Sequence, residues 1–229
     1  MSGDLPARTV GECYRSVRSR LGPLLADLDE AAWEVDVPAT PGWRVRDVLA
    51  HLVGNCEDAA AGRLTGPPDE AMTAEQVERH SDDDPAMLLA RWHELAPDFE
   101  HGVTALGIWP AFIDVWSHEH DVRGALGQPG SRDDQDTRDV FILVSGGWRP
   151  DPAPQGPVVL ATDLGDRTLY EGPSGAPVIT LDASAFEVNR LRLGRRSEEQ
   201  VRAMAWSEPP GPWLPELFAF GPRAEPLDW

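Results

Sequence analysis

The spacing of apolar residues changes partway along this chain, and this change constrains the fold more than any other feature. Over the first part, apolar residues recur at helical spacing in four long segments. A linker-like run of prolines follows between residues 150 and 157. Beyond it the apolar segments are short, rich in β-branched residues and bounded by Gly, Pro and Asp, as strands are. We therefore expect a helical domain over residues 1–148 and a small α+β domain over residues 149–229.

The helical domain is expected to be a four-helix bundle, with helices over residues 10–28, 45–63, 85–106 and 110–127. Asp84 has the position of an N-cap followed by Pro85 at the first helical position, and Gly127 has that of a C-cap. A loop rich in Pro, Asp and Glu is expected over residues 66–84. Bundles of this kind build ligand and metal sites from side chains on facing helices.

A further helix over residues 134–144 is expected to end the first domain. Strands of the second domain are predicted over residues 158–162, 167–170 and 178–181. Asp182 is a candidate cap for a helix that runs through residue 193, and Ser197 to Gln200 form a capping-box pattern that opens another. We expect the Pro-rich tail, residues 209–229, to pack on the body through its aromatic residues, Trp213, Phe218 and Phe220.

Composition excludes several classes of function. The net charge is −19, from 39 acidic and 20 basic residues, and every basic residue other than histidine is Arg. Nucleic acids and anionic membranes are therefore disfavoured partners, because phosphate binding needs a basic surface. There is no signal-peptide pattern and no apolar run near the roughly 20 residues of a membrane helix, so we expect a cytoplasmic protein. Cys13 and Cys56 fall in helical patterns and are expected to be buried free thiols.

Three side chains suggest a metal site. Asp114 and His118 are four residues apart on a predicted helix, so they share one face. His51 lies on another predicted helix. If it packs beside Asp114 and His118, the three residues provide two imidazoles and one carboxylate. That set suits a divalent metal and leaves coordination positions open for water or a thiol. Trp43 and Trp116 flank the two segments and are candidates to wall a pocket, although ordinary core packing is the alternative.

Polar residues near the predicted metal ligands have less specific interpretations. Asp47 lies one turn before His51, and it is either an acceptor for the imidazole N–H or a charge in the first helical turn. His120 is turned by about 200° from His118, at about 100° per residue, and is expected at the polar surface or an interface. The remaining histidines have no partner pattern and are expected to be solvated; they are His80, His93 and His101.

Four segments of the chain together resemble the mycothiol-dependent maleylpyruvate isomerase family, whose bundle belongs to the wider DinB-like, thiol-transferase superfamily. They are Pro41-Gly-Trp43 with Val45–Leu52, His118–Gly127, Phe186–Arg190 through Gly194–Gln200, and Phe220–Arg223. The resemblance spans most of the chain. It implies a divalent metal, expected to be Zn²⁺, held by His51, Asp114 and His118, with mycothiol as the thiol cofactor. The family usually has Glu where this chain has Asp114, whose side chain is one methylene shorter.

The resemblance also implies a catalytic arginine from the C-terminal domain, and Arg195 is the matching residue, with Arg196 beside it. A surface salt bridge is the alternative for both. The expected function is addition of a metal-activated thiolate to an electrophilic small molecule, as an isomerase or a thiol S-transferase. Two other readings stay open: a non-catalytic binding or interaction protein on the same bundle, and a metal-dependent hydrolase that uses water.

Overall fold

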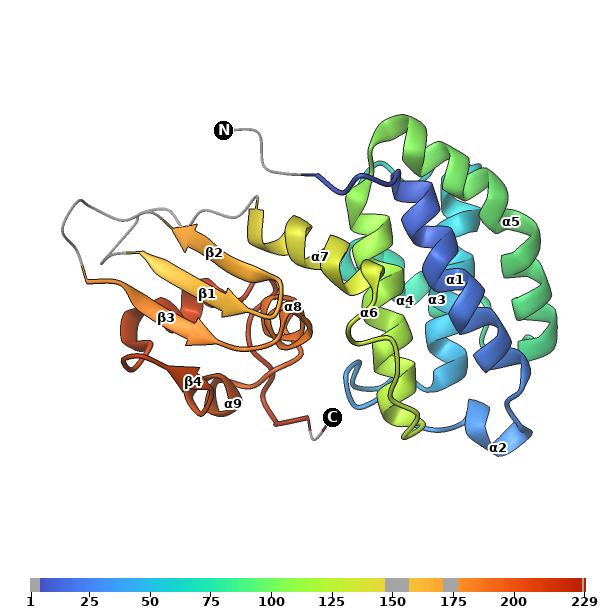
Figure 1. Cartoon of the computed structure of the whole chain (residues 1–229). Helices are drawn as coiled ribbons and strands as arrows, with labels where there is room; N and C mark the ends of the chain where they lie inside the picture. Colours follow the sequence, from blue (N-terminus) through green and yellow to red (C-terminus); the bar gives the residue numbers. More distant parts are fainter. Residues whose placement is uncertain (1–4, 147–156, 171–176, 228) are drawn as a thin grey trace. The chain divides into compact units, whose positions relative to one another are not determined.

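The computed structural model describes residues 5–146, 157–170, 177–227 and 229. The chain forms two compact units, one over residues 7–130 and one over residues 131–229 with the N-terminal segment (Figure 1). Helix α7 (Gln135–Gly146), expected in the first domain, packs against α8 (Ala185–Arg192) in the second unit. The expected domain boundary at residues 148 and 149, and the prolines at 150, 152 and 154, lie outside the described residues.

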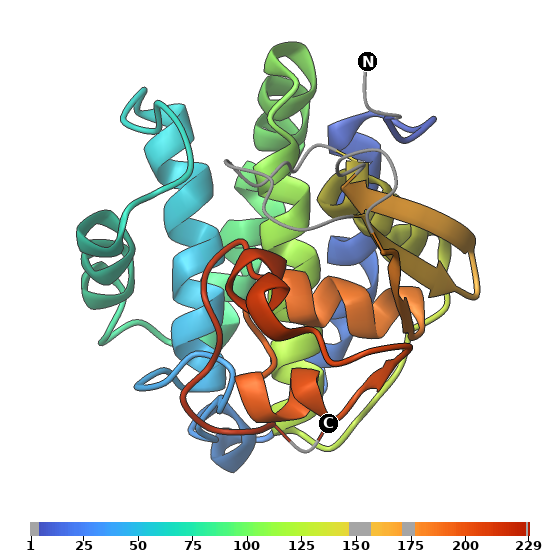
Figure 2. The same ribbon diagram turned by 90° about the vertical axis from the view of Figure 1, so that its left-hand side faces the viewer.

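The first unit is the expected four-helix bundle. Its long helices are α1 (Val10–Ala26), α3 (Val45–Ala60), α5 (Pro85–Leu106) and α6 (Trp109–Ala125). Helices α1 and α3 each contact both α5 and α6. Figures 1 and 2 show α3 and α6 next to each other, which places the two helices with the candidate ligands side by side.

Local sequence explains where these helices begin and end. Asp84 caps α5 by accepting from the Ala86 amide, with Pro85 in the first turn, as expected. Gly107 ends the same helix with φ of 65°, in the left-handed region that suits glycine. Thr9 opens α1 through a reciprocal capping box with Glu12. Each cap satisfies backbone groups that the helix itself leaves unpaired.

Ion pairs between partly exposed arginines and buried carboxylates join α1 to its neighbours. Glu100 of α5 is 1% exposed and pairs with Arg15 at 2.7 Å and Arg18 at 2.8 Å. Glu119 of α6 is fully buried and pairs with Arg20 of α1 at 2.7 Å. A buried carboxylate is costly unless it is paired and hydrogen-bonded, so these contacts fix how the helices are aligned.

Two helices were not expected, α2 (Glu30–Trp33) and α4 (Glu70–Arg79). The prediction of a loop over residues 66–84 is therefore wrong for ten of its residues. Asp69 caps α4 by accepting from the Met72 amide, and the helix packs against α3 (Figure 2). Gln76 is the only buried side chain of α4, so no apolar stripe marks the helix in the sequence.

The second unit is a small α+β unit, as expected. Its sheet has the order β2-β1-β3-β4, in which β1 pairs antiparallel with β2 and parallel with β3. The strands are β1 (Val158–Thr162), β2 (Gly165–Tyr170), β3 (Ile179–Asp182) and β4 (Ala205–Trp206). The three predicted strands are confirmed, and β4 adds a short pairing with β3 that the sequence did not indicate.

The helices of this unit correct two expectations. Asp182 does not cap α8, because it is the last residue of β3, and the cap is Ser184, which accepts from the Glu187 amide. Ser197 and Gln200 form the expected capping box of α9 (Glu198–Arg202).

The C-terminal tail packs on this unit, mostly as expected. It contains a 3-10 helix, η1 (Gly211–Leu217), and Trp213 and Phe218 are buried in the core of the unit. Phe220 was expected to pack but is 76% exposed. Among the described residues, no helix is both long and apolar enough to cross a membrane.

Candidate metal centre

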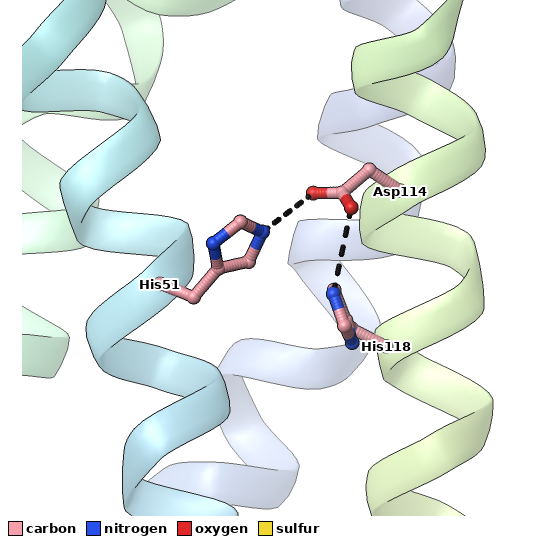
Figure 3. A group of neighbouring side chains, drawn as sticks. All are labelled: His51, Asp114 and His118. Atoms are coloured by element: carbon pink, nitrogen blue, oxygen red, sulfur yellow. Dashed lines mark hydrogen bonds and ion pairs between the residues drawn. The ribbon is translucent and has the colours of Figure 1, made fainter. Parts of the chain in front are cut away.

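His51 from α3 and Asp114 and His118 from α6 point toward one another (Figure 3). One Asp114 oxygen, Oδ2, lies 3.3 Å from His51 Nε2. The other, Oδ1, lies 3.4 Å from His118 Nε2. All three candidate ligand atoms are within 4.8 Å of one another. The i, i+4 spacing and the facing helix thus produce the cluster that the sequence predicted.

The donor set fits a divalent cation. Two imidazole nitrogens and a carboxylate are a common set for Zn²⁺ in catalytic sites, which keep further positions open. Both histidines are buried, whereas the side chain of Asp114 is 34% exposed. The cluster is therefore fixed on the histidine side and accessible from the carboxylate side.

The charges of the cluster are strongly coupled. Burial by itself raises the pKa of Asp114, but the charges of His51 and His118 outweigh it and hold that pKa well below its usual range. Burial alone would lower the pKa of His118, yet Asp114, and then Asp121, raise it to about 9. In the metal-free protein the carboxylate of Asp114 is thus ionised, and it stabilises the positively charged form of His118. A cation bound by His118 would take the place of the proton that Asp114 and Asp121 stabilise on that imidazole.

A second set of side chains holds the imidazoles. His51 Nδ1 lies 2.8 Å from Gln76 Oε1, and Asn55 Nδ2 lies 3.1 Å from His51 Nε2. Asp121 Oδ2 lies 3.4 Å from His118 Nδ1. The contacts of Gln76 and Asp121 are made to Nδ1, and such outer contacts orient metal-binding histidines and tune their basicity. The Asn55 contact is made to Nε2 of His51, so a metal on that nitrogen would displace it.

Aromatic side chains border the cluster. The Trp43 ring is stacked with His118 at 5.9 Å between centroids and lies 5.3 Å from His51. Trp43 is thus a wall of the site, as the sequence suggested. Trp116 is fully buried and contacts His120 at 4.5 Å, so it belongs to the core.

Of the two alternatives for Asp47, the structure supports a role at the start of the helix. Its Oδ2 accepts from the Arg44 backbone amide at 2.8 Å and from Arg44 Nε at 2.9 Å. Gln76, rather than Asp47, lies beside the His51 imidazole. The sequence did not indicate Gln76, because it did not indicate helix α4. Asn55, also missed, lies four residues after His51, and that spacing was the signal that could have identified it.

Two expectations for other histidines are wrong. His120 is 3% exposed, because residues 115–122 of α6 are all buried and its angle around the helix does not decide exposure. His80 is 7% exposed rather than solvated, since it lies between Asp83 at 2.8 Å and Glu57 at 3.2 Å. His93 and His101 are exposed, as expected.

Both candidate arginines lie in the second unit. Arg196 forms a two-pronged ion pair with Glu187, with both N–O distances at 2.8 Å, so it makes the salt bridge considered as its alternative role, although it is buried rather than at the surface. Arg195 Nη1 donates to the Leu193 carbonyl at 2.7 Å. A catalytic role for Arg195 stays a prediction.

The sequence and the fold of this chain are similar to those of known proteins. The family model described as the mycothiol maleylpyruvate isomerase N-terminal domain matches residues 14–123, a range that contains His51, Asp114 and His118. The crystal structure of the mycothiol-dependent maleylpyruvate isomerase is 18% identical, with a TM-score of 0.53 over 81% of this chain and 88% of that chain. A histidine-to-alanine mutant of that enzyme gives a TM-score of 0.51 at the same identity and coverage.

No curated protein sequence matches the chain. The solved structures establish the fold, and the family model shows what the bundle is similar to. The resemblance drawn from the sequence is therefore confirmed: residues 14–123 are similar to the mycothiol maleylpyruvate isomerase N-terminal domain, and the fold of the chain is similar to that of the solved isomerase.

Proposed function

We propose that this protein is a metal- and mycothiol-dependent enzyme, an isomerase or a thiol S-transferase, that adds a thiolate to an electrophilic small molecule. The observation that carries the proposal is the convergence of His51, Asp114 and His118 within 4.8 Å in a bundle of this family. The substrate class follows from the chemistry of a thiolate, which attacks activated alkenes, epoxides or a maleyl double bond.

The residues have distinct roles in this proposal. His51 and His118 would hold Zn²⁺ through nitrogen, and Asp114 would hold it through a carboxylate oxygen. Zn²⁺ held there would supply a Lewis acid that lowers the pKa of a thiol. Trp43 lies against both imidazoles and keeps water from that side of the cluster. Because the side chain of Asp114 is one methylene shorter than that of glutamate, it would reach the metal through a shift of the backbone or through a different coordination mode.

The chemical steps balance without an oxidant. The thiolate forms a C–S bond to one alkene carbon, and the electron pair of the double bond moves to the neighbouring carbonyl as an enolate. Rotation about the resulting single bond and elimination restore the alkene and release the thiolate, which gives cis–trans isomerisation. If the enolate takes up a proton instead, the product is an S-conjugate.

Arg195 is proposed to hold a substrate carboxylate, since a chain of net charge −19 repels acidic substrates without local positive charge. The test compares Arg195→Ala and Arg196→Ala with the wild type on one acidic and one neutral electrophile, with thiol in excess. Loss of a charged hydrogen bond should cost about 1.5–3 kcal/mol on the acidic substrate and much less on the neutral one. Equal activity of all three proteins on the acidic substrate would remove both arginines from the mechanism.

The main test measures metal content and thiol dependence. Protein purified without chelator should contain about one Zn²⁺ per chain, and its turnover should require mycothiol. Asp114→Ala and His118→Ala should abolish metal binding but keep the helical circular-dichroism signal, because the bundle has its own core. Protein without bound metal would favour a non-catalytic binding role, and metal-dependent turnover without thiol would favour a hydrolase.

A further inference from the structure

Gln76 is a fully buried amide at the centre of a hydrogen-bond network around His51. Its Oε1 faces His51 Nδ1 at 2.8 Å, and its Nε2 donates to Asn55 Oδ1 at 3.1 Å. Asn55 Nδ2 in turn lies 3.1 Å from His51 Nε2. Gln76, Asn55 and His51 thus form a closed ring of three hydrogen bonds, which we call the amide–imidazole ring.

Such a ring can run in two directions. In one direction His51 donates from Nδ1 to Gln76, Gln76 donates to Asn55, and Asn55 donates to His51 Nε2. If both amides are turned over, every bond reverses, and His51 must carry its proton on Nε2 instead. A neutral imidazole has one donor and one acceptor nitrogen, so the direction of the ring determines the tautomer.

Two carboxylates outside the ring, those of Asp58 and Asp114, favour one of these directions. Gln76 Nε2 also donates to Asp58 Oδ2 at 2.8 Å, and an ionised carboxylate only accepts. Asp58 is itself 1% exposed and is held by Arg63 and by Arg79, the latter at 3.1 Å. Asn55 Nδ2 also donates to Asp114 Oδ2 at 3.2 Å. Both contacts need the amide nitrogens where they are, so both favour the proton on His51 Nδ1.

We propose that Gln76, oriented by Asp58, is a positioning residue that keeps the His51 proton on Nδ1 and so leaves Nε2 unprotonated, as a nitrogen that can bind a metal once the Asn55 hydrogen bond to it is displaced. The inference rests on the proposed function only in naming a metal as the partner of Nε2. Control of the tautomer matters here because His51 Nε2 lies 3.3 Å from Asp114 Oδ2, a carboxylate oxygen that would accept a hydrogen bond from a protonated Nε2. A proton on Nε2 would bond to that carboxylate and occupy the place of the cation.

The tautomer can be measured directly in metal-free protein. Nitrogen-15 NMR distinguishes protonated from unprotonated imidazole nitrogens, and spectra at several pH values sample the neutral ring of His51. The wild type should show a protonated Nδ1 and an unprotonated Nε2. The opposite assignment would overturn the proposal, whether or not the protein binds a metal.

Variants at position 76 test the role of the amide. Gln76→Met keeps the length of the side chain and removes its hydrogen bonds, so the proton should move to Nε2, where Asp114 accepts it. Gln76→Glu keeps an acceptor opposite Nδ1 and, with a proton on the oxygen that faces Asp58, should keep the wild-type tautomer. Glu75→Met is the matched control, because Glu75 is the preceding residue of α4 and its side chain is 75% exposed. An unchanged tautomer in Gln76→Met would show that Gln76 does not set it.

Zn²⁺ affinity supplies the second measurement, by competition with a fluorescent chelator. Gln76→Met should bind Zn²⁺ about 10–100-fold more weakly than the wild type, as is typical when an outer partner of a histidine ligand is lost. Glu75→Met should bind as the wild type does. Equal affinity of Gln76→Met and the wild type would contradict the proposal. A wild type that binds no Zn²⁺, yet shows the predicted tautomer, would refute the proposed function and leave the positioning role of Gln76 intact.

Discussion

Asp58 is the residue on which the network around His51 depends. It is nearly inaccessible to solvent, yet Gln76, Arg63 and Arg79 all contact it. Burial by itself raises the pKa of Asp58, but the hydrogen bonds from these three side chains outweigh it and lower that pKa. The ionised carboxylate is therefore more stable in the folded protein than in the unfolded chain.

This shift gives a prediction for stability against pH. A carboxylate with a lowered native pKa stabilises the fold fully above its unfolded pKa, and the stabilisation is lost as pH falls toward the native pKa. At pH 7, Asp58→Asn should lower the free energy of unfolding by about 1.5–3 kcal/mol, since a charged hydrogen-bond acceptor is lost. Urea unfolding should show the difference from wild type shrinking below about pH 4. Asp98→Asn, at an exposed position of α5, is the control, and a pH-independent difference for Asp58→Asn would contradict the argument.

The two cysteines should be chemically inert in the folded protein. Cys13 is fully buried and Cys56 is 2% exposed, and burial raises the pKa of Cys56 to about 12. At pH 8 neither thiol is both accessible and ionised, and only the thiolate is a good nucleophile. A chromogenic disulfide reagent should label neither residue in native protein and both in denaturant. Rapid labelling of native protein would place at least one thiol in a reactive environment.

At the level of elements, the packing of α4 on α3 depends on Gly54. A Cβ built on Gly54 would lie 2.6 Å from both Cβ and Cγ of Gln76. These atoms are near the backbone of α4, so the clash cannot be relieved by rotating the end of a side chain. The glycine thus allows Gln76 to reach His51.

Gly54→Ala should therefore push α4 away from α3. We expect a loss of about 1–3 kcal/mol in the free energy of unfolding, as for overpacked sites, together with weaker Zn²⁺ binding. Gly102→Ala is the matched control within α5, because no atom lies within 4 Å of its added Cβ and replacing a helical glycine is otherwise favourable. Chemical denaturation and metal titration of both variants provide the measurements. If Gly54→Ala is as stable and binds Zn²⁺ as well as Gly102→Ala, the close approach has no role.

The comparison of α4 with α6 shows what the sequence could predict. His118 and Asp114 could be paired because their spacing places them on one helical face, and the family motif adds His51. Helix α4 has one buried side chain, and that side chain is the polar Gln76, so apolar periodicity carries no signal for it. Gln76 reaches His51 across 25 positions of sequence, a contact that depends on tertiary packing alone. The ligands were thus predictable, and the groups that orient them were not.

Strand β4 and the cap of α8 show the same limit of prediction from sequence. Strand β4 has two residues and exists through its pairing with Leu181 and Asp182 of β3. Ser184 rather than Asp182 caps α8 because the strand pairing continues through Asp182. The strand β4 and the start of α8 depend on residues that are distant in the sequence. The long helices of the bundle depend on the apolar periodicity of their own segments.

At the scale of the whole molecule, the distribution of charge is uneven. The chain has a net charge of −19, and some of its arginines pair with buried carboxylates, as Arg18 does with Glu100 and Arg20 with Glu119. Those arginines neutralise interior charge and cannot offset the acidic surface. Repulsion among the remaining surface carboxylates should therefore destabilise the folded protein at low ionic strength.

Salt should consequently stabilise this protein. The Debye length falls from about 30 Å at 0.01 M to about 8 Å at 0.15 M, so added NaCl screens the repulsion between distant surface carboxylates. Buried pairs such as Arg20 with Glu119 are screened much less, so their contribution is retained. The Tm of metal-free protein at pH 7 should rise over this range of NaCl and change little above it. Sucrose in place of NaCl controls for effects that do not depend on charge. A Tm that falls as NaCl increases would mean that exposed ion pairs, such as Arg202 with Glu198, stabilise the fold more than the net charge destabilises it.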